Sequence, residues 1–182
     1  MIRLPGRGPA DIPIIATDRL TLRGHRLSDF EASAALWGDE RTTQYISGKP
    51  STRSESWARL LRFFGLWAML GYGYWAVEET ATGDYVGEVG FGDFKRDMVP
   101  DIHGIPEAGW VLNARHGGKG YATEAVMAAL TWGETAFSGA QTVCIIKADN
   151  LASIRVAEKC GFVLETVTEL NGNPTRLYRR LP

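Results

Sequence analysis

The stretch that decides the fold is Arg115-His116-Gly117-Gly118-Lys119-Gly120-Tyr121-Ala122-Thr123-Glu124-Ala125. An apolar, strand-like run over 108–112 leads into it, and an apolar pattern with helical spacing over 122–137 leads out of it. Three glycines between a strand and a helix let the main chain turn sharply and leave its N–H groups uncovered. Together with the positive end of the helix dipole, these N–H groups favour an anion, and a pyrophosphate suits them best.

The glycine spacing departs from two widespread phosphate-binding motifs. It lacks the third glycine of the dinucleotide-binding G-x-G-x-x-G pattern. Lys119 is followed by Gly120, so no serine or threonine is placed to hold magnesium as in a P-loop. A nucleotide-dependent enzyme is therefore disfavoured. Taken alone, the turn also fits an ordinary connection between a strand and a helix that binds nothing.

Length and composition indicate an ordinary globular domain. The chain has 182 residues, of which 45% are hydrophobic, and its 20 basic and 21 acidic residues give a net charge of −1. This charge provides no overall field for nucleic acid or an anionic membrane, so neither partner is expected. The longest apolar stretch, 63–70, is much shorter than the roughly 20 residues of a membrane span. We expect a flexible extension over residues 1–12 and a single domain over 13–182.

Two cysteines, Cys144 and Cys160, do not suggest a disulfide framework. Their pattern indicates a reducing, cytoplasmic location and two buried apolar side chains. The three histidines are scattered and neither cysteine is part of a CxxC motif, so no metal site is expected.

The order of expected elements is strand, two helices, three strands, helix, strand, helix and two strands. This order predicts an α/β domain of the α+β type, with a mixed, mostly antiparallel central sheet of about six or seven strands flanked by helices. Ser28 with Glu31 is a candidate helix start, as is Ser51 or Ser54, and Gly71 and Gly161 are candidate helix ends. The expected strands cover 14–23, 74–78, 85–94, 107–112, 142–146, 163–170 and 175–180, and the expected helices 28–36, 51–70, 122–137 and 150–159.

Five segments taken together resemble one protein family. They are Thr17-Asp18-Arg19-Leu20-Thr21-Leu22-Arg23, Glu107-x-Gly109-Trp110-Val111-Leu112, Gly118 to Ala125, Asn150-x-x-Ser153 and Glu158-Lys159-Cys160-Gly161-Phe162. In this combination the chain resembles a GCN5-related N-acetyltransferase (GNAT), and within that superfamily the ribosomal-protein N-terminal acetyltransferases of the RimJ/RimL type. The resemblance covers about residues 14–180.

The resemblance implies the acyl-CoA N-acyltransferase fold, with acetyl-CoA as co-substrate and no metal. Main-chain N–H groups of 116–121 would hold the pyrophosphate, and the pantetheine arm would lie along 110–113 like an added strand. Arg115 and Lys119 would either add charge near the phosphates or remain solvated surface residues. The implied cofactor-binding residues are Trp110, Val111, Leu112, Asn113, Arg115, His116, Gly117, Gly118, Lys119, Gly120, Tyr121, Ala122, Asn150 and Ser153.

Acetyl transfer to an amine needs a neutral amine, a polarised thioester carbonyl and a protonated leaving thiolate. The resemblance places Ser153 near the sulfur as the leaving-group acid, although a serine here is equally a helix N-cap. Glu107, Glu88 and Glu169 are candidates for the base, and each is alternatively an ordinary surface carboxylate. A main-chain N–H near Val111 would polarise the carbonyl.

The acceptor amine stays open between a protein N-terminus and a small molecule. Deprotonating an α-amine at neutral pH costs about 1 kcal/mol, against nearly 5 kcal/mol for a lysine ammonium, so the former needs only a weak base. The aromatic residues of the early helices, such as Trp37 and Trp67, line either an acceptor pocket or the core. Acidic residues of the 94–106 region and Asp93 would attract a cationic acceptor, but Lys95 and Arg96 offset them.

A second class of function remains possible, namely a non-catalytic module that binds acyl-CoA as a sensor or scaffold. Ser153 and the carboxylates favour the enzyme. The sequence is compatible with a monomer or a homodimer.

Overall fold

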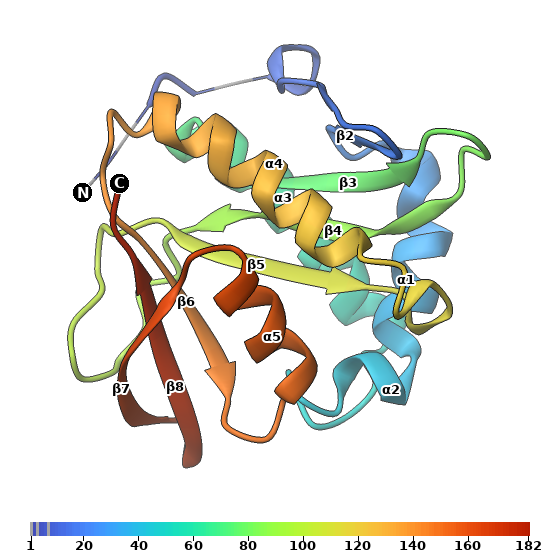
Figure 1. The fold of residues 1–182 in the computed structure, drawn as a ribbon. Coiled ribbons are helices and arrows are strands. Elements are labelled where there is room, and N and C mark those ends of the chain that lie inside the picture. Colours follow the sequence, from blue (N-terminus) through green and yellow to red (C-terminus); the bar gives the residue numbers. More distant parts are fainter. Residues whose placement is uncertain (1, 3, 7) are drawn as a thin grey trace.

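The computed structural model describes residues 2, 4–6 and 8–182, and its centre is one eight-stranded sheet (Figure 1). The strand order across the sheet is β1-β2-β3-β4-β5-β6-β8-β7. The strands are β1 (Ile15–Ala16), β2 (Leu20–Arg23), β3 (Tyr74–Glu79), β4 (Tyr85–Gly92), β5 (Glu107–Leu112), β6 (Thr142–Lys147), β7 (Val163–Leu170) and β8 (Asn173–Arg180). The α-helices are α1 (Phe30–Gly38), α2 (Glu40–Thr43), α3 (Arg53–Leu70), α4 (Tyr121–Ala136) and α5 (Leu151–Lys159).

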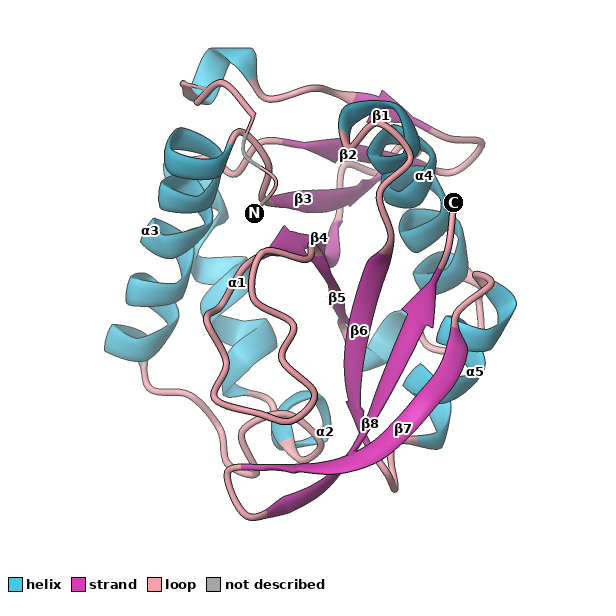
Figure 2. Ribbon diagram, turned by 90° about the vertical axis from the view of Figure 1, so that its left-hand side faces the viewer, coloured by secondary structure: helices cyan, strands magenta, loops and turns pink. Residues whose placement is uncertain are grey.

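Helices cover both faces of the sheet, as predicted. Helices α1 and α3 lie on one side, and α4 and α5 lie on the other (Figure 2). The main core cluster joins the sheet to α3 and α4, and the largest fully buried side chains include Trp67, Trp75 and Phe91. Trp132 of α4 packs edge-on against Trp75, with ring centroids 5.1 Å apart, which holds α4 close to the sheet.

One irregularity of the sheet creates the space for a site. Every neighbouring pair of strands is antiparallel except β5 and β6, which are parallel and are joined through α4. Only Glu107 and Val143 are paired in this ladder. Beyond that pair the two strands diverge, with β5 running to one side and β6 turning away from it (Figure 1). The later part of β5 therefore pairs with β4 on one side but has no neighbouring strand on the β6 side.

The predicted mixed, mostly antiparallel sheet is confirmed, although it has eight strands where six or seven were expected. The difference arises because the expected strand 14–23 is a hairpin of β1 and β2. Its turn is stabilised by Thr17, whose hydroxyl accepts from the Leu20 N–H at 2.9 Å. The helix ends at Gly71 and Gly161 are confirmed, since both glycines adopt positive φ, at 74° and 83°.

Two expected helix starts were wrong. The first helix begins at Phe30 and has no Ser28 cap, because a short 3-10 turn over Leu27–Asp29 precedes it. Asp29 there accepts from the Arg26 N–H and from the buried Arg23 guanidinium. Helix α3 begins after Thr52, and neither Ser51 nor Ser54 is its cap. Thr52 and Glu55 form the reciprocal capping box, which satisfies two main-chain donors.

The expected flexible extension, 1–12, falls partly outside the described residues, which omit 1, 3 and 7. In the described part, the Leu4 N–H donates to the Leu70 carbonyl at 2.9 Å, and Ile12 is 6% exposed within the core cluster. The packing therefore continues without a break across the expected domain boundary at residue 13. Flexibility of this segment stays a prediction.

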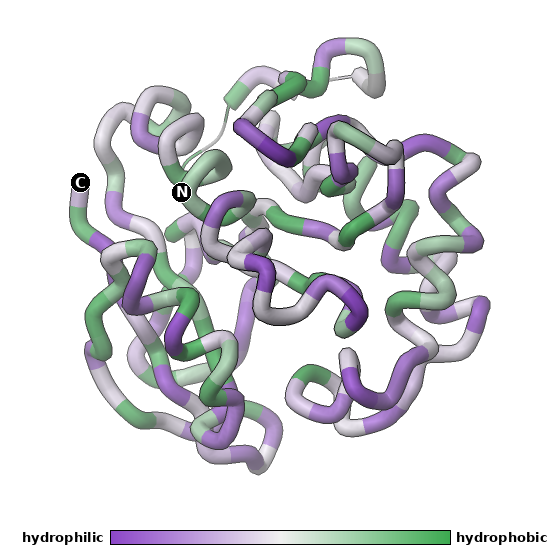
Figure 3. The backbone as a smooth tube through the Cα atoms, turned by 45° about the vertical axis from the view of Figure 1, so that its right-hand side comes forward, coloured by the Kyte–Doolittle hydropathy of each residue, from purple (hydrophilic) through white to green (hydrophobic). Residues whose placement is uncertain are grey.

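Hydrophobic and hydrophilic residues alternate along the chain (Figure 3). Within the described residues, no helix has both the length and the apolar character that a membrane crossing requires.

Candidate active site

The glycine turn lies where β5 ends and α4 begins, as the sequence predicts. Gly118 and Gly120 have φ of 77° and 80°, in the left-handed region that side chains other than glycine rarely adopt. A methyl group at Gly118 would meet no heavy atom within 4 Å, so this side of the turn is open. Gly120 is the N-cap of the 16-residue helix α4, and the first N–H groups of that helix have no partner within the helix. The turn therefore has the geometry of an anion site.

The glycine turn is held in place by residues 17–19, which connect β1 to β2. Arg19 donates from its Nη1 to the Lys119 carbonyl at 2.9 Å and from its Nε to Glu124 at 2.7 Å. Glu124 also accepts from the Thr17 hydroxyl at 2.6 Å. The Glu124 carboxylate therefore has a structural role. Desolvation alone would raise the pKa of Glu124, but these hydrogen bonds outweigh it, so the pKa is lowered overall.

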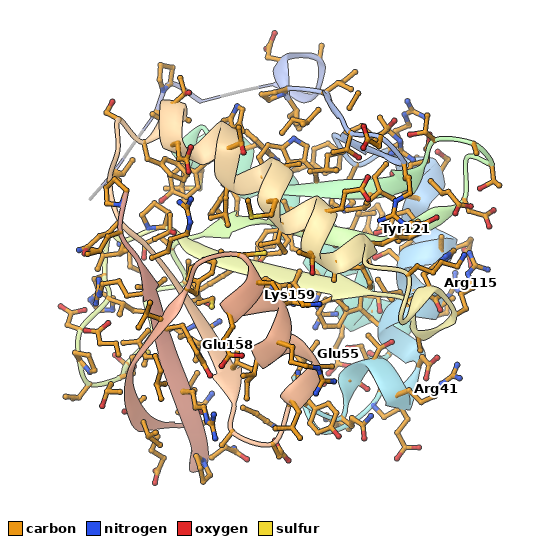
Figure 4. All side chains as sticks on the ribbon, viewed as in Figure 1. Arg41, Glu55, Arg115, Tyr121, Glu158 and Lys159 are labelled. Atoms are coloured by element: carbon orange, nitrogen blue, oxygen red, sulfur yellow. The ribbon has the colours of Figure 1, made fainter. Side chains whose placement is uncertain are left out.

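Basic and aromatic side chains surround the turn. Arg115 and Lys119 are exposed, and Arg115 lies beside the tip of the turn (Figure 4). The His116 ring is buried and stacks on Tyr121, with centroids 6.0 Å apart. Desolvation and then the charges of Arg115 and Lys119 lower the pKa of His116, so the imidazole is neutral at neutral pH. Tyr121 bonds through its hydroxyl to Glu79, which makes it a packing residue of the turn.

The later part of β5 presents its main chain to the cleft. Just after β5, Asn113 donates its N–H to the carbonyl of Val86 in β4 at 2.9 Å. Main-chain groups alternate in an antiparallel ladder, so those of Leu112 and Trp110 point away from β4, toward the gap between β5 and β6. The sequence predicts that a main-chain N–H near Val111 polarises the thioester carbonyl. Because the N–H groups alternate in direction, those that face the cleft belong to the neighbours of Val111, namely Trp110 and Leu112.

Across the gap lies the start of α5. Asn150 is the N-cap of this helix and accepts from the Ser153 N–H at 3.1 Å. The alternative interpretation of Ser153 as the N-cap is therefore wrong, because Asn150 has that role. Ser153 lines the cleft with Asn150 and Val156. Among the described residues, the Ser153 hydroxyl has no hydrogen-bond partner.

Glu107 is the candidate base that the fold places in the cleft. Its side chain is buried and forms a bidentate ion pair with Arg96, with N–O distances of 2.6 and 2.7 Å. Desolvation raises the pKa of Glu107, and Arg96 partly opposes this rise. A carboxylate with a raised pKa is a stronger base than an ordinary surface glutamate.

The other two candidate bases, Glu88 and Glu169, lie outside this site. Glu88 is 0% exposed and does not line the cleft. It accepts from the Ser33 hydroxyl, the Trp37 indole and the Tyr85 hydroxyl, all within 2.8 Å, so it is a structural acceptor. Glu169 is exposed on β7 and is likewise absent from the cleft lining. The geometry favours Glu107 over both.

A cavity of about 1050 Å³ joins these features. It extends from Val111, Leu112 and Ala122 beside the glycine turn to residues of α2 and α3 at its other end. Trp37 lines it, whereas Trp67 belongs to the core and Trp57 is exposed at 37%. Tyr74 and Arg62 are among the lining residues that sequence reasoning missed, because each belongs to an element far from the motifs and carries no local signal.

Both cysteines are buried and free, as predicted. Burial raises the pKa of both thiols, that of Cys160 to about 11, which disfavours the thiolate form that a nucleophile needs. No cluster of three or more possible metal ligands occurs among residues 2, 4–6 and 8–182.

A parallel pair of strands that diverges beside a glycine turn, with that turn at the start of the intervening helix, defines a class of proteins that bind acyl-CoA. The chain belongs to the GNAT family: residues 19–163 match the acetyltransferase (GNAT) domain. It is therefore an acetyl-CoA-dependent acetyltransferase.

Similar proteins agree with this assignment. YkkB of Bacillus subtilis, an uncharacterised protein, is 30% identical over an alignment of 179 residues that covers 91% of this chain and 94% of YkkB. The crystal structure of an acetyltransferase from Agrobacterium tumefaciens has a TM-score of 0.81 at 27% identity, covering 94% of this chain and 95% of that one. RimL, a ribosomal L7/L12 α-N-protein acetyltransferase solved with coenzyme A, shares the fold with a TM-score of 0.74 at 20% identity, covering 93% and 98% of the two chains.

Proposed function

We propose that this protein transfers the acetyl group of acetyl-CoA to a primary amine, directly and within a ternary complex. The observation that carries the proposal is the divergence of β5 from β6 beside the glycine turn, with Ser153 and Glu107 in the same cavity. The acceptor is a protein N-terminus or a small-molecule amine. Free, buried cysteines are compatible with a reducing, cytoplasmic location.

The residues present fit acetyl-CoA, whose thioester supplies the activated acetyl group. The left-handed glycines and the start of α4 would hold the pyrophosphate, with Arg115 and Lys119 adding charge. Main-chain groups of Trp110 and Leu112 would pair with the pantetheine amides. Asn113, His116, Gly117, Tyr121 and Ala122 would shape the binding surface, and Asn150 would position Ser153.

In the transfer step, Glu107 accepts the proton of the ammonium, directly or through water, and so provides a neutral amine. The amine nitrogen forms a bond to the acetyl carbon as the carbon–sulfur bond breaks. A main-chain N–H of β5 donates to the carbonyl oxygen, where negative charge develops. The Ser153 hydroxyl donates its proton to the leaving sulfur and regains one from the amide nitrogen, which carries a surplus proton once its bond to carbon has formed. Glu107 releases its proton to water.

The first test combines calorimetry with coenzyme A and thiol release from acetyl-CoA across a panel of amines and peptides. Amine-dependent thiol release is expected. Binding of acetyl-CoA without release for any amine would support the alternative function, a sensor or scaffold.

Replacement of the candidate acid gives a more specific test. The Ser153→Ala variant is expected to lower kcat about 100-fold, because it removes one proton donor, with the Kd for coenzyme A nearly unchanged. The exposed Ser54 of α3 provides a control, since Ser54→Ala should leave kcat unaltered. An unchanged kcat in Ser153→Ala would remove Ser153 from the mechanism.

A further inference from the structure

The residues that line the cavity carry more positive than negative charge. Charged residues of the whole lining comprise five basic side chains and two acidic ones, namely Arg41, Arg62, Lys95, Arg96 and Lys147 against Asp93 and Glu107. The acidic loop residue Asp93 is thus part of this wall. Its effect on an acceptor depends on whether its charge is already neutralised.

Both acidic side chains of the lining are ion-paired. The Asp93 side chain is 3% exposed, and its carboxylate lies 2.5 Å from the Lys95 ammonium. Glu107 is held by both nitrogens of the Arg96 fork. A polyamine would therefore find no carboxylate in this wall that is not already neutralised, and it would meet several positive charges. The weak expectation that the acidic loop residues attract a cation is not favoured by this arrangement.

Two of the five basic side chains have no carboxylate partner among the described residues. Arg41 pairs with Asp39 outside the cavity at 2.7 Å. Among the described residues, neither Arg62 nor Lys147 forms an ion pair with a carboxylate. The Arg62 guanidinium lies 5.5 Å from the Phe94 ring centroid, and the Arg96 guanidinium lies 5.0 Å from the same ring. Phe94 thus places Arg62 close to the ion pair that includes the candidate base.

From this arrangement we propose that the acceptor is an amine that carries an anionic group, which Arg62 binds while the amine faces Glu107. A guanidinium beside an aromatic ring is suited to a carboxylate, since it offers two parallel donors. The anionic group is either the carboxylate of a free amino acid or an acidic side chain near a protein N-terminus. This inference rests on the proposed function of the same site.

The test compares matched acceptors with the wild-type enzyme. Lysine and cadaverine differ only by one carboxylate, and peptides that begin Ser-Glu and Ser-Gln differ only by one charge. We expect kcat/KM to be about tenfold higher or more for the anionic member of at least one pair, as one charge-assisted hydrogen bond would give. The pair that shows the preference identifies the source of the anionic group.

Arg62→Gln is expected to bring the two members of that pair within about threefold, through a higher KM for the anionic one. Arg53→Gln removes the same charge from the same helix but lies outside the lining, so it should retain the preference. Equal or faster acetylation of the members that lack the anionic group, or a preference that survives in Arg62→Gln, would overturn this inference and leave the proposed function intact. If no amine at all is acetylated, both fall.

Discussion

Tyr74 and Gly109 show how a single missing side chain shapes the site. Tyr74 of β3 lies in register with Gly90 of β4, and Gly90 lies in register with Gly109 of β5. The tyrosine ring is stacked on Phe63 of α3, with centroids 4.7 Å apart, and its hydroxyl reaches Gly109. A methyl group at Gly109 would lie 2.1 Å from that hydroxyl. Glycine is needed at this position because the tyrosine crosses the adjacent strand to reach the cavity wall.

Gly109→Ala is therefore expected to destabilise the protein by about 1–3 kcal/mol, since the methyl group would force the tyrosine ring away from its stacked position on Phe63. Urea unfolding of Gly109→Ala, of Tyr74→Phe and of the variant with both substitutions would measure the change in the free energy of unfolding. Tyr74→Phe removes the hydroxyl and should recover part of the loss when combined with Gly109→Ala. Wild-type stability in the single Gly109→Ala variant would show that the ring moves freely.

At the scale of elements, the glycine turn and α4 form the unit that the sequence describes best. The glycines at 118 and 120, the strand before them and the helix after them are all where the pattern placed them. This success has a local cause, because left-handed glycines, a short apolar strand and helical periodicity are each encoded within a few residues. The first residues of α1 and α3 were harder to predict, because several possible capping residues are adjacent in the sequence and tertiary contacts determine which of them caps the helix.

Gly120→Ala is expected to lower the free energy of unfolding by about 1–2 kcal/mol, because alanine is strained at positive φ. It should also raise the Kd for coenzyme A about tenfold, since a relaxed turn misaligns at least one donor. Gly83 has φ of 75° in the turn between β3 and β4, and a methyl group there would meet no heavy atom within 4 Å. Gly83→Ala should thus show a similar loss of stability with an unchanged Kd, as measured by calorimetry. Equal Kd values for Gly120→Ala and wild type would argue against the turn as the phosphate site.

For the molecule as a whole, one buried histidine links stability to pH. The His25 ring is 4% exposed and stacks on Phe63 at 5.0 Å, with its Nε2 3.9 Å from Glu88. Desolvation lowers the pKa of His25, although Glu88 and Asp29 oppose this and Arg23 adds to it. The folded state therefore binds fewer protons than the unfolded state at pH values between the folded pKa and about 6.5. Stability should fall as the pH drops through this range.

His25→Phe keeps an aromatic ring against Phe63 and removes the titration. Urea unfolding between pH 7.5 and 5.5 is expected to give a smaller loss of stability for this variant than for wild type. His103→Gln changes an exposed histidine and should retain the wild-type slope. A slope for His25→Phe as steep as that of wild type would assign the effect to other groups.

The order and types of the elements, the glycine turn and the family resemblance were all predictable from the sequence, because each depends on residues close together in the chain. Tertiary structure decided which carboxylate faces the cavity, since Glu107 and Glu88 lie on adjacent strands with similar local patterns. It also decided that β5 and β6 separate after one pair, and that Arg62 and Tyr74 reach the same cavity. These features depend on how distant segments pack, and packing of side chains across a sheet leaves no short-range signature in the sequence.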